Sequence, residues 1–307
     1  MQNRPKVIVI GGPTASGKTG LSVELAKKIS GEIISADSMQ IYKEMDIGTA
    51  KVTEEEKQGI QHYMIDIISP DQRYSVSDYK INAEKAIEEI LEKGCTPIVV
   101  GGTGLYINSL IYNINYPEIS IDLKYREYLE KRIEKEGLET LYNEAYKIDS
   151  KATAIISKND KKRIMRILEI YKETGKTKTQ LEIESRQEEP KYDYKVFAIN
   201  MDREILYDRI NKRVDLMFEQ GLIEEVKNIY QKYKSFPTAM QGLGYKEVVE
   251  YINGKYSYEE MKEKIKMESR RYAKRQITWF KAIKELTWLD GQKNKQDNIN
   301  IILEVCK

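Results

Sequence analysis

A loop that could hold phosphate follows a short apolar run close to the N-terminus. The run at residues 7–10 is β-branched, and the loop then fits the pattern GxxxxGK[ST]. Glycines let such a loop curl with its N–H groups inward, and the helix that follows adds a positive dipole end. We therefore predict a cradle for phosphate or pyrophosphate, made of Gly12, Pro13, Thr14, Ala15, Ser16, Gly17, Lys18 and Thr19.

The last two residues of this loop have separate expected roles. Lys18 would place a point charge on the terminal phosphate, and Thr19 carries the hydroxyl that usually binds a Mg²⁺ bridging two phosphate groups. Mg²⁺ is therefore the predicted cofactor, with Thr19 as its protein ligand. The loop does not choose between ATP, GTP and an isoprenoid pyrophosphate, because their phosphate ends are similar.

A carboxylate follows the second β-branched run. Asp37 comes two residues after the run at 32–35, and the carboxyl end of a parallel strand beside a phosphate loop faces the ligand crevice. Asp37 is therefore placed for chemistry on a ligand bound there. An aspartate here could equally be a helix N-cap or turn residue, and spacing alone leaves both interpretations open.

These residues need a scaffold, and the pattern of the chain predicts one. Four short apolar runs, at residues 7–10, 32–35, 97–100 and 196–199, predict buried parallel strands. Helix-period stretches between them, such as 19–29 and 76–93, supply crossover helices. We expect an α/β fold with a doubly wound parallel sheet of the P-loop NTPase type.

Residues 120–189 are rich in charged and helix-forming residues, with no strand-like run. This texture predicts a helical insertion. The expected organisation is a first part of the core at 1–119, a helical insertion at 120–190, and a second part of the core at 191–307. The last part is mostly helical, with a glycine-rich corner at 241–245.

The bulk composition narrows the class of protein. The 307 residues are 40% hydrophobic and 33% charged, which argues against disorder, and the net charge of +2 does not by itself indicate a nucleic-acid binder. No apolar segment approaches the roughly 18 residues of a membrane span, so a cytosolic protein is expected. Cys95 and Cys306 have no Cys or His cluster around them, and the single histidine, His62, is assigned no chemistry.

Four segments in order resemble the tRNA dimethylallyltransferase family. They are GGPTASGKT, then DSMQIYKEMDIGTAK, then VVGGTGLYI, and finally YAKRQITWF, and they span almost the whole chain. The resemblance implies transfer of a dimethylallyl group from dimethylallyl pyrophosphate to N6 of the adenosine 3′ of the anticodon, with release of pyrophosphate. The chain ends at Lys307 without the Cys and His of a zinc finger, so it resembles the shorter bacterial form.

The resemblance also implies roles for individual residues. Asp37 matches the acceptor of the N6 proton, and Thr103 matches a position beside the reacting centre, although its glycine turn would form in any case. An arginine at 206–217 would hold the pyrophosphate, with Arg213 the first choice and Arg209 the second; either could instead lie on a solvated helix face. The positions that match tRNA contacts near the centre are Asp37, Ser38, Met39, Gln40 and Thr103.

Further candidate tRNA contacts lie in basic stretches. Residues 157–166 are basic and open a helix with an Asn or Asp cap, and 262–284 combine Lys and Arg with aromatic residues. Charge runs on helices are also commonly solvated surface, and Trp279 and Phe280 are expected in the core. The candidates in these two stretches are Asn159, Asp160, Lys161, Lys162, Arg163, Lys274 and Arg275. Outside them, Gln241 and Lys246 lie in a further segment that resembles an RNA-contacting part of the family, and Arg126 is also a candidate.

The expected partners are the tRNA anticodon stem-loop and dimethylallyl pyrophosphate, with no membrane and a monomeric protein. One rival is a P-loop kinase that uses the same loop for ATP and Asp37 as base for a hydroxyl. A second rival is a nucleotide-switched RNA-binding protein, which should show a strand ending in a Walker B aspartate; residues 198–202 approach this pattern only weakly.

Overall fold

The computed structural model describes residues 4–115, 122–185 and 189–307. The chain divides into two compact units. Unit 1 combines Met1–Ile111 with Lys191–Lys307, and unit 2 is the intervening Tyr112–Pro190. The second unit thus begins eight residues before the insertion expected at 120, since the last helix of the first half ends at Ile111.

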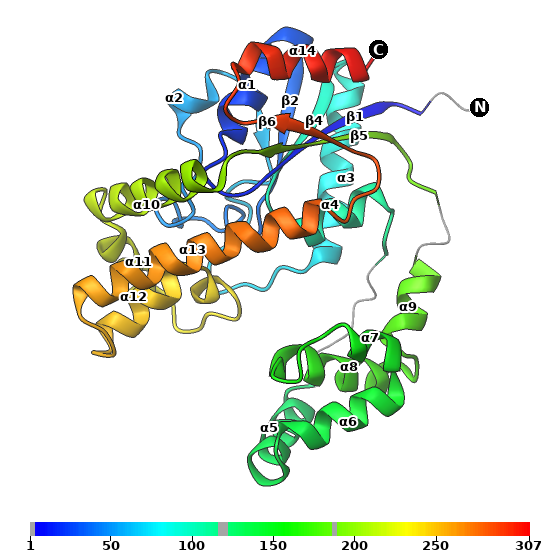
Figure 1. The fold of residues 1–307 in the computed structure, drawn as a ribbon, viewed down its shortest axis with the longest axis vertical. Coiled ribbons are helices and arrows are strands. Elements are labelled where there is room, and N and C mark those ends of the chain that lie inside the picture. Colours follow the sequence, from blue (N-terminus) through cyan, green and yellow to red (C-terminus); the bar gives the residue numbers. More distant parts are fainter. Residues whose placement is uncertain (1–3, 116–121, 186–188) are drawn as a thin grey trace. The chain divides into compact units, whose positions relative to one another are not determined.

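A six-stranded parallel sheet forms the centre of unit 1, with strand order β3-β2-β4-β1-β5-β6 (Figure 1). The predicted α/β class is confirmed, and each of the four predicted runs forms a strand. Two edge strands were not predicted, because one is only two residues long and the other is mostly exposed or half-buried. The strands are β1 Lys6–Gly11, β2 Gly31–Ala36, β3 His62–Tyr63, β4 Thr96–Gly101, β5 Asp193–Asn200 and β6 Leu286–Asp290.

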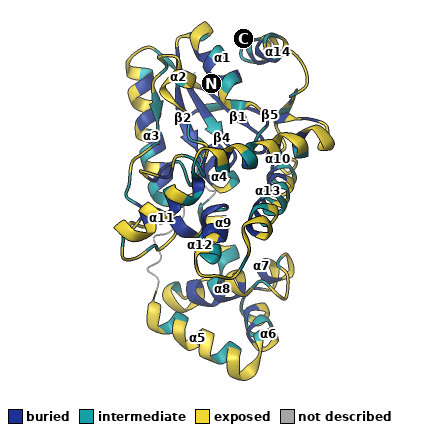
Figure 2. Cartoon of the chain, turned by 90° about the vertical axis from the view of Figure 1, so that its left-hand side faces the viewer, coloured by how far each residue is buried: buried dark blue, intermediate teal, exposed yellow. Residues whose placement is uncertain are grey.

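The central strands are apolar along their length because helices cover both faces of the sheet (Figure 2). In β1, Val7 and Val9 pack on one face and Ile8 and Ile10 on the other. Full burial on both sides is what favours continuous β-branched runs over alternation. One face receives α1 (Lys18–Ile29), α10 (Arg203–Glu219) and α14 (Lys295–Val305), and the other α3 (Val76–Glu92) and α4 (Gly104–Ile111).

The C-terminal half of unit 1 adds a helical layer beside the sheet. It contains α11 (Leu222–Lys232), the 3₁₀ turn Ala239–Gln241, α12 (Tyr245–Ile252) and α13 (Tyr258–Phe280). These helices share an apolar cluster with the segment after β2, through Ile41, Tyr42 and Met45. At the end of α13, Phe280 is fully buried and Trp279 packs beside it, as expected. A short helix, α2 (Glu54–Lys57), precedes β3.

The described residues of unit 2 form helices and no strand (Figure 1). Their core is an apolar cluster that includes Leu129, Leu141, Ile164 and Leu168. Asp160 caps the N-terminus of one of these helices, accepting the Arg163 N–H at 3.1 Å. The helices are α5 Leu123–Glu136, α6 Leu138–Ile148, α7 Ser150–Ala154, α8 Lys161–Thr174 and α9 Lys178–Ser185.

None of the helices in the described ranges is long and apolar enough to cross a membrane.

Candidate active site

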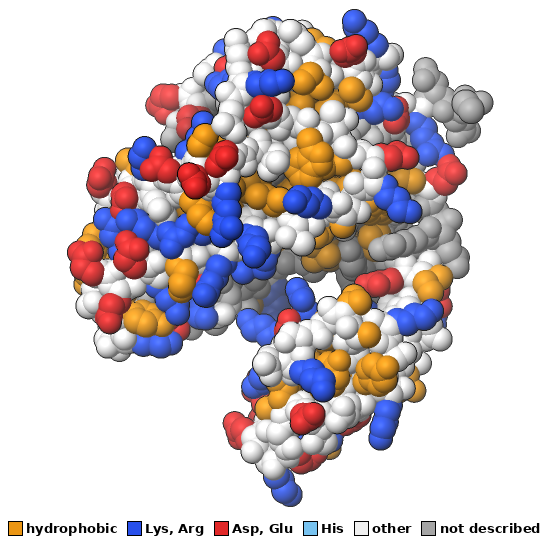
Figure 3. Space-filling model, viewed as in Figure 1, with side chains coloured by type: hydrophobic (Ala, Val, Ile, Leu, Met, Phe, Trp, Pro, Cys, Tyr) orange, Lys and Arg blue, Asp and Glu red, His pale blue; other side chains and the backbone are white. Residues whose placement is uncertain are grey.

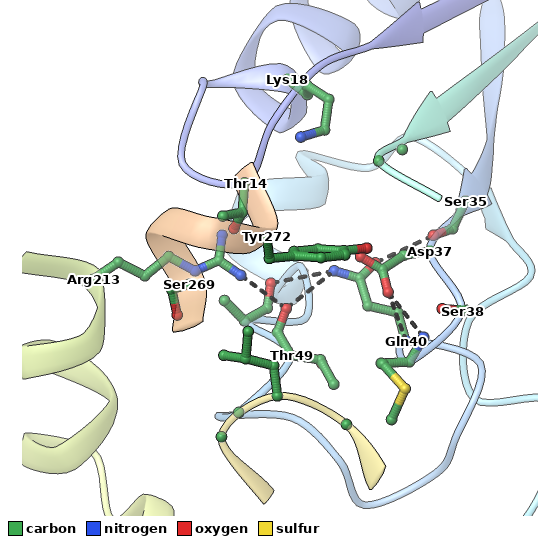
Figure 4. Close-up of a pocket in the computed structure, with 18 of the residues that line it drawn as sticks. Thr14, Lys18, Ser35, Asp37, Ser38, Gln40, Thr49, Arg213, Ser269 and Tyr272 are labelled. Carbon is green, nitrogen blue, oxygen red and sulfur yellow. Dashed lines mark hydrogen bonds between the residues drawn. The ribbon is translucent and has the colours of Figure 1, made fainter. Parts of the chain in front are cut away.

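A cavity of about 400 Å³ opens in unit 1 at the carboxyl ends of β1, β2 and β4 (Figure 4). This is the edge at which ligands bind in parallel α/β sheets. The phosphate loop, the turn after β2, the loop after Met45, α10 and α13 all contribute to its wall. The polar residues that line it include Thr14, Lys18, Thr19, Asp37, Ser38, Gln40, Thr49, Arg213, Ser269, Tyr272, Arg275 and Gln276.

The predicted phosphate loop forms the strand-loop-helix turn that its pattern requires. Gly17, directly before α1, has φ 89°, a left-handed conformation that favours glycine. Thr14, Lys18 and Thr19 line the cavity. The other loop residues, Gly12, Pro13, Ala15, Ser16 and Gly17, shape the backbone without lining it.

Lys18 is a perturbed cationic group of the cavity. Its Nζ donates to the carbonyl of Pro13 at 2.7 Å, within its own loop. Burial, helped by the nearby Arg213 charge, lowers the pKa of Lys18 to about 7, and Asp37 acts in the opposite direction. A multiply charged anion entering the cavity would favour the protonated amine.

Asp37 lines the cavity and also holds the turn after β2. Its Oδ1 accepts the N–H of Met39 at 2.9 Å and that of Gln40 at 3.4 Å. The turn interpretation left open by the sequence is therefore realised. It leaves the second oxygen, Oδ2, without a hydrogen bond to any described residue, so the same side chain can still accept a proton.

Thr103 does not line the cavity but braces the Asp37 turn from behind. Its Oγ1 accepts the Ser38 N–H at 3.0 Å and donates to Ser38 Oγ at 3.4 Å. Thr103 therefore contacts a residue of the cavity wall, Ser38, without lining the cavity itself.

The two arginine candidates on α10 differ sharply in position. Arg213 lines the cavity, and one guanidinium N–H donates to the Thr49 carbonyl at 3.0 Å. Burial lowers the pKa of Arg213, and the Asp37 carboxylate opposes this shift. Arg209 is exposed and does not line the cavity.

One face of α13 closes the cavity. Ser269, Tyr272, Arg275 and Gln276 all line it, and a spacing of three, four and seven residues puts such positions on one side of a helix. Burial, with the Asp37 charge second, raises the pKa of Tyr272 to about 12. The sequence interpretation treated this helix as an RNA-binding surface and missed Ser269 and Gln276, although their spacing around Tyr272 was visible.

Gln276 ties two glycine-rich segments together. Its side-chain oxygen accepts the N–H of Thr14 at 3.0 Å, and its nitrogen donates to the Gly102 carbonyl at 3.0 Å. The buried amide therefore fixes the phosphate loop against the turn after β4. A buried polar group is stable only when its partners are satisfied, and Gln276 meets that condition.

The remaining candidates of unit 1 lie on or near the cavity rim. Gln241 and Arg275 line the cavity, and Lys246 lines a second hollow that also includes Gln241. Lys274 is exposed. Lys and Arg side chains gather on the visible face of unit 1 where α10 and α13 run (Figure 3).

The candidates of unit 2 have contrasting environments. Asn159, Lys161, Lys162 and Arg163 are exposed. Arg126 instead makes a bidentate ion pair with the buried Glu169, at 2.7 and 2.9 Å. Its guanidinium is therefore occupied within the unit.

The donors present fit a magnesium ion better than a transition metal. Among the described residues there is no group of three or more His, Cys, Asp or Glu side chains that could hold a metal. Thr19 lines the cavity, and its hydroxyl has no hydrogen-bond partner among the residues described. Mg²⁺ typically takes few protein oxygens and completes its shell with water and substrate phosphates, which this set allows.

Comparison with known proteins supports one family. The family model described as IPP transferase matches residues 40–283. The tRNA dimethylallyltransferase of Acetivibrio thermocellus is 51% identical over 292 residues, which cover 95% of this chain and 93% of that protein. The tRNA dimethylallyltransferase of Bacillus cereus (strain ATCC 10987) is 46% identical over 296 residues, covering 95% and 93% respectively.

Solved structures of such enzymes share the fold. The full-length tRNA isopentenylpyrophosphate transferase of Bacillus halodurans has a TM-score of 0.74 at 42% identity, covering 99% of this chain and 96% of that one. A eukaryotic dimethylallyltransferase described as acting on tRNA has a TM-score of 0.80 at 31% identity, covering 98% and 79% respectively.

Proposed function

We propose, because this chain belongs to the tRNA dimethylallyltransferase family, that it transfers a dimethylallyl group from dimethylallyl pyrophosphate to N6 of the adenosine 3′ of the anticodon in tRNA. One observation carries the proposal at the level of the site. A carboxylate with a free oxygen, Asp37, lines the same cavity as the cationic side chains of Lys18 and Arg213. Proton acceptance and pyrophosphate departure can therefore occur within one enclosure.

The reaction joins a weak nucleophile to an allylic carbon. The lone pair of the adenine N6 amine is conjugated into the ring, so attack needs a base that removes the N6 proton as the C–N bond forms. Asp37 is the proposed acceptor, through Oδ2, while Oδ1 stays bonded to the turn that positions it. Thr103 contributes by holding Ser38 in that turn.

The leaving group must be stabilised as the bond from carbon to pyrophosphate breaks. Negative charge then develops on the bridging oxygen, and cations placed beforehand in a poorly solvated cavity stabilise it strongly. Lys18 and Arg213 are the proposed partners of this charge, with the N–H groups of residues 12–19. A bound Mg²⁺, held through the Thr19 hydroxyl, would neutralise part of the pyrophosphate charge.

Substrate tRNA would reach the cavity through its anticodon loop. An adenosine in a loop is only partly stacked and is extruded at a cost of a few kcal/mol. The basic side chains on α13, including Lys274 and the rim residue Arg275, are proposed to contact the RNA backbone. In unit 2, the exposed Lys161, Lys162 and Arg163 are proposed for the same role. The enzyme is proposed to act as a monomer.

A nucleotide or metabolite kinase remains the relevant competitor because it would use the same loop and a base at Asp37. The family match favours prenyl transfer over phosphoryl transfer, and the substrates consumed distinguish the two reactions.

The decisive experiment measures transfer of labelled dimethylallyl from its pyrophosphate to unmodified tRNA with Mg²⁺. A matched control uses an anticodon stem-loop in which the target adenosine is replaced by uridine. Label on the intact tRNA alone is the expected result. Absence of label on both, together with phosphoryl transfer from ATP, would support the kinase instead.

A further inference from the structure

One acidic side chain outside the cavity holds a loop of its wall. Glu225, on α11, accepts three successive backbone N–H groups: those of Asp46 and Ile47 at Oε2, at 2.9 and 2.7 Å, and that of Gly48 at Oε1, at 3.1 Å. Successive N–H groups that converge in this way form a concavity suited to an anion. Here a carboxylate from 177 to 179 residues away fills it.

The same carboxylate is fixed from its other side. The hydroxyl of Tyr245 donates to Glu225 Oε1 at 2.5 Å, and the Tyr245 ring is almost fully buried. That ring packs so closely on Gly48 that a Cβ there would lie 2.4 Å from it. Only glycine fits at this approach, so Tyr245, Glu225 and Gly48 form one tightly packed contact.

The loop held by Glu225 continues directly into the cavity wall. The next carbonyl, that of Thr49, accepts the Arg213 guanidinium at 3.0 Å and the Gln40 amide at 3.5 Å. The Thr49 hydroxyl in turn donates to the Met45 carbonyl at 2.7 Å, which folds the loop on itself. The loop thus links Glu225 on one side to Arg213 on the other.

We infer that Glu225 is a positioning residue for pyrophosphate binding: it fixes residues 46–48 so that the Thr49 carbonyl aims the Arg213 guanidinium into the cavity. The choice of pyrophosphate as the ligand rests on the proposed function. Its binding can be measured whether or not the chain transfers a prenyl group. An arginine on a flexible stem needs such a fixed acceptor, because its charge acts on the leaving group only in one orientation. The Arg213 bond is made to a backbone atom, so the loop conformation sets its position.

The test substitutes Glu225→Gln and measures the dissociation constant of inorganic pyrophosphate with Mg²⁺ by calorimetry. The amide cannot accept all three N–H groups, because its nitrogen would face donors. We expect affinity to fall on the order of tenfold, and turnover to fall further, as expected for misplaced groups. Glu224→Gln is the matched control, since Glu224 is exposed on the same helix and lies outside the cavity wall, and it should bind as the unaltered chain does.

A double-mutant cycle separates positioning from general destabilisation. Arg213→Ala should weaken pyrophosphate binding, and adding Glu225→Gln to it should cause little further loss, because Glu225 acts through Arg213. Tyr245→Phe, which keeps the ring and removes one donor, should show a smaller loss in the same direction. Thermal unfolding of each variant verifies that it is folded at the assay temperature.

Three results would overturn the inference. They are unchanged pyrophosphate affinity in folded Glu225→Gln, losses that add fully with Arg213→Ala, and no pyrophosphate binding by the unaltered chain. If the unaltered chain binds pyrophosphate but does not transfer a prenyl group, the result counts against the proposed function. The effect of Glu225→Gln on pyrophosphate affinity can still be interpreted in that case.

Discussion

The cationic groups of the two units differ in how firmly they are held. In unit 1, Lys18 and Arg213 are half-buried, each bonded to a backbone carbonyl, and burial lowers the pKa of both. In unit 2, Lys161, Lys162 and Arg163 project from the start of α8 into solvent. The fixed charges of unit 1 can stabilise charge at one position in the cavity, whereas the exposed charges of unit 2 can adapt to a partner's surface.

The two kinds of charge should therefore respond differently to perturbation. A fixed, desolvated charge is screened weakly by salt, and its effect is sensitive to small displacements. An exposed charge is screened strongly by salt, and its effect tolerates small displacements. Three perturbations of decreasing size test whether this distinction holds.

The largest effect is expected at the carboxylate that the fixed charges surround. Asp37→Ala removes the proposed base, so turnover should fall at least about a hundredfold, the scale of general base catalysis. The test measures the single-turnover rate of transfer and the affinity for tRNA in the same variant. The rate should fall, and the affinity should change little. Normal turnover in this variant would exclude Asp37 from the proton transfer. It would also weaken the distinction drawn between the fixed charges of unit 1 and the exposed charges of unit 2.

The next effect concerns Lys18, whose pKa of about 7 lies far below its ordinary value of 10.5. A bound pyrophosphate favours the ammonium form, so binding above pH 7 takes up a proton. Affinity for pyrophosphate should then fall on the order of tenfold between pH 6.5 and 8.5. Calorimetry at pH 8 in two buffers of different ionisation enthalpy measures this uptake directly.

Lys18→Met supplies the control for that experiment because it retains only the titration of pyrophosphate itself. The lowered pKa of Lys18 also makes the free energy of unfolding depend on pH. The unfolded chain binds more protons than the folded chain between about pH 7 and 10.5, so the Lys18 contribution to stability rises with pH in this window. Equal proton uptake by Lys18→Met and the unaltered chain would contradict the prediction.

The smallest effect is expected for the exposed charges of α8. Replacing Lys161, Lys162 and Arg163 together by alanine should raise the KM for tRNA on the order of fivefold and make its salt dependence shallower, with turnover at saturating tRNA unchanged. The KM measured across a series of salt concentrations tests this.

A matched triple variant replaces Lys135, Lys147 and Lys151, which are also exposed lysines of unit 2. It should retain the original salt dependence. Equal losses in both triples would mean that net charge alone matters, and that α8 has no special role.

Local patterns were sufficient to predict the phosphate loop and the strands beside it. The loop is a run of eight residues between a strand and a helix, and its conformation follows from glycines within the run itself. Asp37 was predicted for the same reason, since it directly follows β2. The edge strand β6 was missed because only Leu289 of its five residues is buried, so no continuous apolar run marked it.

The supporting residues of the site could not be predicted in the same way. Gln276 contacts Thr14 and Gly102, which lie 262 and 174 residues away. Glu225 and Gly48 lie 177 residues apart. A glutamine or glutamate on an amphipathic helix looks like solvated surface in sequence, and only the fold shows which backbone donors it meets.

The order of the strands has a consequence for how the chain matures. β1 lies between β4 and β5, and β5 begins only at Asp193, after the whole of unit 2. Unit 2 is continuous in sequence and rich in local contacts, whereas the sheet depends on distant pairings that close slowly. On the ribosome, we therefore expect the second unit to fold while β1 still lacks one neighbour. At that stage the unpaired edge of β1 is exposed, and we expect the nascent chain to be most vulnerable to aggregation then.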